Sequence, residues 1–141
     1  PPSSPPAIPL PSIPPAASAP LPLDIVVSGG CGPANFENSR FEVQGQTATG
    51  AAYYKQEQVA MYFYHDPGCT GDETFVDLWV FDHVQPDLEA LVELDGDGRC
   101  RIDGAIVDSN AEFGTSPPIG SHSLRAKCDG EWIYTPITLT W

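Results

Sequence analysis

The sequence is poor in basic residues, and this shortage limits the partners that the protein can attract. Of its 141 residues only 6 are Lys or Arg, against 19 Asp or Glu, which gives a formal net charge of −13. A field of this sign repels polyanions and argues against binding to nucleic acid or to an anionic membrane surface. No stretch approaches the run of about 20 apolar residues that crosses a bilayer as a helix. We expect neither nucleic acid nor a membrane as a partner.

The sequence also lacks the patterns that mark common catalytic and metal sites. It contains no Gly-x-Ser-x-Gly, no His-Glu-x-x-His and no Cys-x-x-Cys. The acidic residues offer many carboxylate pairs, so no particular pair points to glycoside hydrolysis. We therefore predict that the protein is not an enzyme and that it has no obligatory cofactor.

Four cysteines are present, and they are widely spaced: Cys31, Cys69, Cys100 and Cys128. An even number in a small acidic chain is typical of two disulfides formed in an oxidising compartment, and we expect a secreted, extracellular protein. Three connectivities are possible. We favour Cys31–Cys69 with Cys100–Cys128 because each bond closes a local loop, which would contribute roughly 3–4 kcal/mol in the chain-entropy model.

Residues 1–22 differ in composition from the rest of the chain. Ten of these 22 residues are proline, and the first charged residue is Asp24. Proline disfavours helix and sheet interior, so we expect an extended polyproline II arm that could span roughly 70 Å. A simple solvated spacer has no use for apolar side chains, and Pro-rich segments dock into aromatic grooves. We predict that Ile8, Leu10 and Ile13 are the docking side chains of this arm, against the alternative of an arm that contacts nothing.

The sequence has no Asn-x-Ser/Thr site, so any attached glycan is expected to be O-linked. Serines in an extended Pro-rich segment are accessible to glycosyltransferases. The candidate glycosylation sites are Ser3, Ser4, Ser12 and Ser18.

From residue 23 the pattern becomes that of an all-β domain, which we place at residues 23–141. Short runs rich in β-branched and aromatic residues alternate with turn residues, which predicts a small disulfide-bonded β-sandwich or barrel. The strand at 75–81 is apolar on both sides and is expected to be covered on both faces. The predicted strands are 23–28, 40–44, 52–54, 59–64, 75–81, 90–94, 100–107, 121–128 and 132–140.

Two of these strands raise further questions. Pro136 within the last strand indicates an edge strand or a bulge, and an edge with exposed aromatics is a candidate docking surface. Tyr62 and Tyr64 lie on one side of another strand, as a stacking surface or as a core edge with hydrated hydroxyls.

The segment Asp95-Gly-Asp-Gly98 allows two interpretations. Asp-Gly pairs between two strands indicate a hairpin turn, which we favour. Two closely spaced carboxylates also resemble half of a calcium loop, although the later positions of an EF-hand loop do not match. The alternative is a calcium site made by Asp95 and Asp97, with Asp103 as a third ligand.

Several ordered blocks carry a resemblance: Cys31-Gly-Pro-Ala-Asn35, Gly50-Ala-Ala-Tyr-Tyr-Lys55, Ala60-Met-Tyr-Phe-Tyr-His-Asp66, Leu94-Asp-Gly-Asp-Gly-Arg-Cys100 and Cys128-Asp-Gly-Glu-Trp132. With them, residues 28–140 resemble a small cysteine-paired module of secreted and surface proteins of unicellular algae and other aquatic microbes. A Pro-rich arm before such a module is similar to subunits of glycan-coated extracellular fibrils. That resemblance implies an arm that lies in a groove of adjoining subunits and carries sugar.

The leading hypothesis is a structural subunit of an extracellular fibril, a homopolymer that assembles head to tail through its N-terminal arm. An arm exchanged in one direction makes a heterologous contact, which propagates into a filament unless it closes a ring. The alternative is a carbohydrate-binding or adhesive module on a Pro-rich stalk. The aromatic residues that favour this alternative are Tyr53, Tyr54, Tyr62, Tyr64, Trp79, Trp132 and Trp141.

Overall fold

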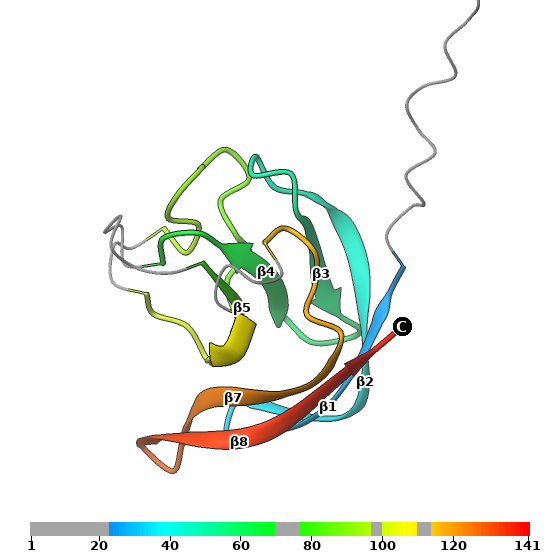
Figure 1. Ribbon diagram of the computed structural model, residues 1–141, viewed down its shortest axis with the longest axis vertical. Helices are drawn as coiled ribbons and strands as arrows, with labels where there is room; N and C mark the ends of the chain where they lie inside the picture. The colour runs from blue at the N-terminus through cyan, green and yellow to red at the C-terminus, as the bar shows by residue number, and fades with distance from the viewer. Residues whose placement is uncertain (1–22, 70–76, 97–99, 110–113) are drawn as a thin grey trace, which may run out of the picture.

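The computed structural model describes residues 23–69, 77–96, 100–109 and 114–141, which form an antiparallel barrel (Figure 1). Strands pair in chain order, and β1 pairs with β8 to close the barrel. The strands are β1 (Ile25–Cys31), β2 (Ala34–Gln46), β3 (Ala52–Gln56), β4 (Tyr62–Asp66), β5 (Leu78–Asp82), β6 (Gly104–Ile106), β7 (Gly120–Cys128) and β8 (Glu131–Thr140). A 3₁₀ turn, η2 (Val107–Ser109), follows β6. The predicted all-β class is confirmed, and of the two expected architectures the protein adopts the barrel.

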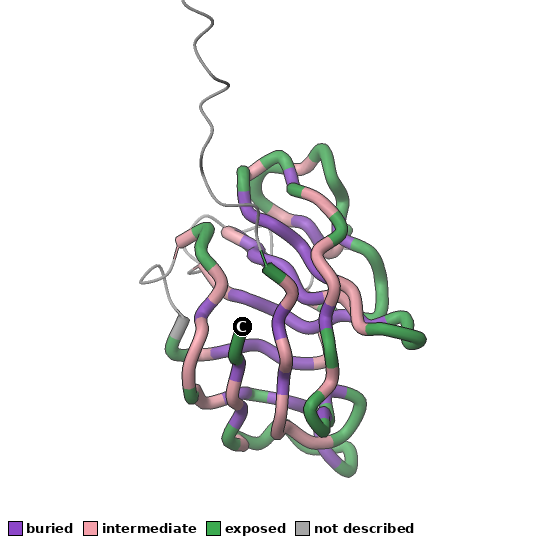
Figure 2. The backbone as a smooth tube through the Cα atoms, turned by 90° about the vertical axis from the view of Figure 1, so that its right-hand side faces the viewer, coloured by how far each residue is buried: buried purple, intermediate pink, exposed green. Residues whose placement is uncertain are grey.

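Aromatic rings fill the interior of the barrel. The Phe63 and Phe81 rings stack with their centroids 4.5 Å apart, and Phe36 and Phe41 pack against Phe81 at 4.9 and 5.6 Å. Phe63 and Phe81 face each other across the β4–β5 pair. Phe36 and Phe41, five positions apart on β2, both face inward because β2 is irregular at Asn38, which has a positive φ. Buried and exposed positions alternate at the start of β2 and in the second half of β7, from Leu124 to Cys128 (Figure 2).

A second apolar cluster lies outside the barrel wall. Tyr64 and Val80 point away from the interior, and Leu94 and Ala105 pack with them. Leu94 belongs to the long connection between β5 and β6, so this connection covers the outer face of β4 and β5 as a lid. Of the strand predicted at 75–81, the described part is therefore covered on both faces, as expected.

The prediction of a strand at 90–94 is wrong, and so is the prediction of a hairpin turn at Asp95-Gly-Asp-Gly98 after it. Residues 90–94 form bends rather than a strand, and β6 begins only at Gly104. Leu94 is fully buried, yet its N–H donates to the Asp66 carboxylate at 3.0 Å and its carbonyl accepts from Asp87 N–H at 2.9 Å. These apolar residues are buried by lying across the barrel instead of by pairing in a sheet.

The favoured disulfide pairing is also wrong. The bonds are Cys31–Cys128, with a Cα–Cα distance of 5.7 Å, and Cys69–Cys100, with a Cα–Cα distance of 4.7 Å. The first joins the end of β1 to the end of β7, 97 residues away in sequence. Closure of the barrel brings these distant ends together, which an argument from loop length alone does not capture.

The Gly29-Gly30 pair lies inside β1. Both glycines have positive φ, and an added Cβ would lie 2.5 Å from the Pro136 carbonyl oxygen or 1.9 Å from that of Ala34. The glycines therefore let β1 bulge and pass close to neighbouring backbone.

Candidate binding surface

The outer side of the β7–β8 hairpin carries large side chains that no described segment covers. Trp132 and Tyr134 on β8 lie opposite Lys127 and Arg125 on β7, so all four side chains share one face. Tyr134 is 65% exposed and Trp132 is 44% exposed. We call these four residues the aromatic face.

Arg125 holds the two rings of the aromatic face in relation to each other. Its guanidinium carbon lies 6.0 Å from the Trp132 ring centroid and 5.7 Å from that of Tyr134. Cation–π attraction at such distances contributes on the order of 0.5–1 kcal/mol at exposed sites. The rings are thus partly preorganised, although they face solvent.

The same hairpin provides a half-length sheet edge. Only residues 137–140 of β8 pair with β1, whereas residues 131–136 pair, among the described strands, with β7 alone. Pro136, which has no N–H, lies at the boundary between these halves. The prediction of an edge at Pro136 is therefore confirmed for the first half of β8 and wrong for the second, which the closed barrel pairs on both sides.

A pocket of about 360 Å³ lies beside Tyr134, between the β7–β8 hairpin and the 3₁₀ turn. His122 Nδ1 lies 3.1 Å from Asp108 Oδ2, and Ser121 Oγ lies 3.2 Å from Thr138 Oγ1. The pocket is lined by Asp108, Ser121, His122, Ser123, Tyr134, Thr135 and Pro136. It combines an aromatic wall with hydroxyl groups, and it extends the aromatic face toward the middle of β8.

The N-terminal end of the barrel is anchored beside the C-terminal end. Val26 pairs with Thr140, and Trp141, which follows β8, is 56% exposed. Asp24 accepts hydrogen bonds from the Arg40 guanidinium at 2.6 Å and from Val43 N–H at 2.9 Å. The Arg40 hydrogen bond is the main cause of a lowered pKa for this carboxyl. The arm therefore joins the globule at a fixed point of its surface.

The arm itself, residues 1–22, lies outside the described residues. This part of the chain contains the predicted docking side chains and glycosylation sites, Ile8, Leu10, Ile13, Ser3, Ser4, Ser12 and Ser18.

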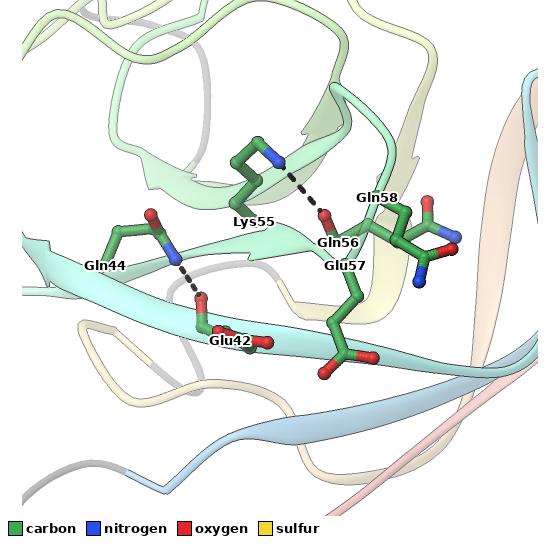
Figure 3. A pocket seen from close by; sticks show the side chains of 6 residues that line it. All are labelled: Glu42, Gln44, Lys55, Gln56, Glu57 and Gln58. Atoms are coloured by element: carbon green, nitrogen blue, oxygen red, sulfur yellow. Dashed lines mark hydrogen bonds between the residues drawn. The ribbon is translucent and has the colours of Figure 1, made fainter.

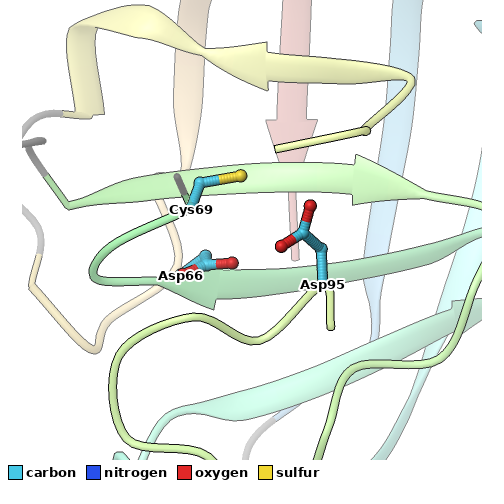
Figure 4. Close-up of side chains that lie close together, drawn as sticks. All are labelled: Asp66, Cys69 and Asp95. Atoms are coloured by element: carbon cyan, nitrogen blue, oxygen red, sulfur yellow. The ribbon is translucent and has the colours of Figure 1, made fainter. Parts of the chain in front are cut away.

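Of the predicted calcium ligands, Asp95 lies close to Asp66 and Cys69 (Figure 4). The Cys69 sulfur is held in a disulfide, and both Asp66 oxygens accept backbone N–H groups, from Gly68 and Leu94. Burial raises the pKa of Asp66 to about 6. These groups tie the lid to β4. Asp95 Oδ2 accepts the Arg101 N–H at 2.8 Å, whereas Asp95 Oδ1 is buried and has no hydrogen-bond partner among the described residues, so a cation at Asp95 stays a prediction.

Asp103 belongs to a different acidic group, with Asp82 and His83. His83 Nδ1 lies 3.1 Å from Asp103 Oδ2, and Asp82 Oδ2 accepts a hydrogen bond from the Tyr64 hydroxyl at 3.0 Å. Asp97 lies outside the described residues. The structure thus does not bring Asp95 and Asp103 into one group.

A polar groove of about 450 Å³ runs along the outer side of β2 and β3 (Figure 3). Gln44 donates to the Glu42 carbonyl and Lys55 to the Gln56 carbonyl, so these side chains partly satisfy the local backbone. A hydrogen bond with Glu57 raises the pKa of Glu42. The groove has no aromatic wall and no buried functional group, and it is the weaker candidate for a binding site.

The structure separates the aromatic residues that the sequence grouped together as candidate ligand platforms. Tyr53, Tyr54, Tyr64 and Trp79 are buried, and Tyr62 is half-buried against the same cluster as Tyr64, so Tyr62 and Tyr64 form a core edge rather than an exposed stacking surface. Trp132 and Trp141 are exposed, as an aromatic edge strand requires. Three members of the aromatic face, Tyr134, Arg125 and Lys127, were not identified from the sequence. The i, i+2 spacing of Trp132 and Tyr134 was the available signal.

No family model, curated protein or solved structure matches this chain. Among the described residues, no helix has the length and apolar character needed to cross a membrane.

Proposed function

We propose that the protein is a structural, non-enzymatic subunit of an extracellular fibril, and that each subunit is linked to the next through its N-terminal arm. The observation that carries this proposal is the closed barrel. Closure leaves no described strand with a whole edge free, the kind of edge through which β-domains otherwise join. Only parts of the described strands, such as residues 131–136 of β8 and 64–66 of β4, are unpaired on one side. Extended assembly of such globules calls for an appended segment, and residues 1–22 are that segment.

The charge distribution supports the same arrangement. All 25 acidic and basic residues lie after residue 23, and they give the globule its net charge of −13. Globules of like charge repel one another, whereas an uncharged arm approaches a neighbouring globule without that penalty. Salt screens the repulsion between globules. Assembly is therefore expected to strengthen as the salt concentration rises.

The two disulfides are consistent with an oxidising environment. Secretion and O-linked glycosylation of the arm serines complete the proposal. Mass spectrometry of the native protein tests them by locating sugar on peptides from residues 1–22.

Electron microscopy and sedimentation test the function itself. The native chain is expected to form filaments, and a chain lacking residues 1–22 is expected to remain monomeric. The core rests on residues 25–139, so the shortened chain retains its fold, which circular dichroism checks. Monomers in both samples at high salt would overturn the proposal.

A second candidate function is carbohydrate binding, which the Tyr134 pocket specifically favours. Its aromatic wall suits the apolar face of a sugar ring, and its serines and Asp108 suit sugar hydroxyls. Under this function, loss of residues 1–22 leaves glycan binding intact.

A further inference from the structure

We propose that the aromatic face and the adjoining Tyr134 pocket accept the N-terminal arm of a second copy of this chain. This inference rests on the proposed function and names the surface through which it operates. The acceptor consists of the outer side of β7 and β8 around Arg125, Trp132 and Tyr134.

The chemistry of the surface fits a proline-rich segment. Such segments bind across exposed aromatic rings, because proline rings pack flat on them and a polyproline II chain loses little conformational entropy. Trp132 and Tyr134 offer two rings two residues apart on one strand, roughly 7 Å along it. The pocket beside Tyr134, about 360 Å³ in volume, has room for a branched apolar side chain such as Ile8, Leu10 or Ile13.

Charge selects the arm over other parts of the chain as the occupant. Arg125 and Lys127 are two of only six basic residues, and they form part of the acceptor face. The arm carries no charged side chain, so it docks without placing a carboxylate over a ring or desolvating an unpaired charge. Another globule surface would bring acidic residues to this contact.

The direction of the chain favours a neighbour's arm over the molecule's own. The arm joins the barrel at Asp24, which Arg40 fixes beside the C-terminal end of β8. Trp132 lies near the opposite end of this ten-residue strand, roughly 30 Å away. The molecule's own arm would have to reverse direction to reach Trp132. Extended as polyproline II, an arm of this length would span roughly 70 Å and reach a neighbouring copy, and the contact would then repeat head to tail.

The test compares full-length variants by filament imaging and by the critical concentration for sedimentation. The double variant Trp132→Ala, Tyr134→Ala is expected to raise the critical concentration by about tenfold or more, because aromatic hot-spot residues contribute that much to binding at an interface. Leu91→Ala, which removes an apolar side chain that is 66% exposed on the lid, is the matched control and is expected to have no effect. Retained disulfides and an unchanged thermal midpoint show that the double variant is folded.

A competition experiment identifies the occupant. A synthetic peptide of residues 1–22, added in excess to the full-length chain, is expected to shorten the filaments, whereas the peptide with Ile8, Leu10 and Ile13 replaced by serine is not.

Shortening by cellohexaose instead of the peptide would assign the face to glycan and overturn the inference. Normal filaments from the double variant would also overturn it while leaving the arm-linked fibril standing. Absence of filaments from the wild-type chain would instead count against the proposed function.

Discussion

Two pairs of strands in this barrel carry aromatic residues on their outer side, and the protein treats them differently. On β4 and β5, Tyr64 and Val80 point outward and are fully buried beneath the lid. On β7 and β8, Trp132 and Tyr134 also point outward, but no described segment covers them. The β5–β6 connection of some twenty residues, held by the Cys69–Cys100 disulfide, covers the first surface, whereas the second is exposed.

This difference indicates that the aromatic face is not exposed merely because the protein failed to pack it. A contiguous exposed patch of large apolar side chains on a small domain marks an interaction site. The lid also exposes apolar side chains, such as Leu91, but among the described residues only the β7–β8 hairpin exposes two aromatic rings held together by one cation. Arg125 holds its rings in place, as a surface kept for a partner requires. The covered side is thus the internal reference against which the exposed side can be tested.

The largest expected effects concern the two disulfides, of which Cys69–Cys100 fastens the lid. The double variant Cys69→Ala, Cys100→Ala should lower the free energy of unfolding by about 3–4 kcal/mol, the loop-entropy value for a separation of 31 residues. Hydrogen exchange at the Leu94 amide should accelerate, because the lid loses its anchor. Replacing Cys31 and Cys128 is the matched control, and it should destabilise the barrel without selectively exposing the lid. Equal exchange at Leu94 in both variants would mean that the lid does not depend on its own disulfide.

The next effect concerns a single hydroxyl on the covered side. Tyr64→Phe removes the donor to buried Asp82, whose pKa is already raised by burial, and leaves its carboxylate oxygen without this partner. We expect a loss of about 1–3 kcal/mol in unfolding free energy, measured by denaturant titration. Tyr134→Phe, the same change on the exposed side, should leave the stability unchanged. A similar loss in both would contradict the contrast between the two surfaces.

A smaller effect is expected from pH. The folded pKa of Asp66 is about 6, raised by burial from 3.8, so the folded state takes up a proton in the window between these values. The stability that this group contributes is complete below pH 3.8 and is lost as the pH rises through about 6. Through Asp66 alone, acidification from pH 6 to pH 5 should therefore stabilise the protein by about 1 kcal/mol. Burial lowers the pKa of His65, so this side chain acts in the opposite sense in the same pH range.

Asp66→Asn provides the control for this pH effect. The amide still accepts one of the two backbone hydrogen bonds but does not titrate, so the gain between pH 6 and pH 5 should shrink. The lowered pKa of Asp24 acts in the opposite sense, but only below pH 3.8. An equal gain in the wild type and in Asp66→Asn would assign the effect to the relief of general acidic repulsion.

Alternating sequence patterns predicted the all-β class, the two-sided coverage of the strand around Trp79 and the exposure of Trp132. These patterns gave wrong predictions where a residue is buried without pairing in the sheet. Leu94 looks like a strand residue because it is apolar, but it is buried beneath a lid without pairing. The disulfide partners depend on which strand ends meet when the barrel closes, and local loop length does not encode this. Tyr134 was missed because a tyrosine gives the same signal in a covered strand as in an exposed one.

The smallest expected effect is on the exposed side, and it bears most directly on assembly. At concentrations below assembly, Trp132→Ala and Tyr134→Ala should each change the unfolding free energy by no more than about 1 kcal/mol, the scale of the cation–π contact between each ring and Arg125. Tyr64→Ala on the covered side should cost several times as much, about 3–5 kcal/mol. A loss of more than about 1.5 kcal/mol at Trp132 in the isolated monomer would show that the chain covers these rings itself. In that case the molecule's own arm occupies the face, and a neighbour's arm would have to displace it. A negligible loss leaves the face free in the monomer, which an acceptor for a second copy requires.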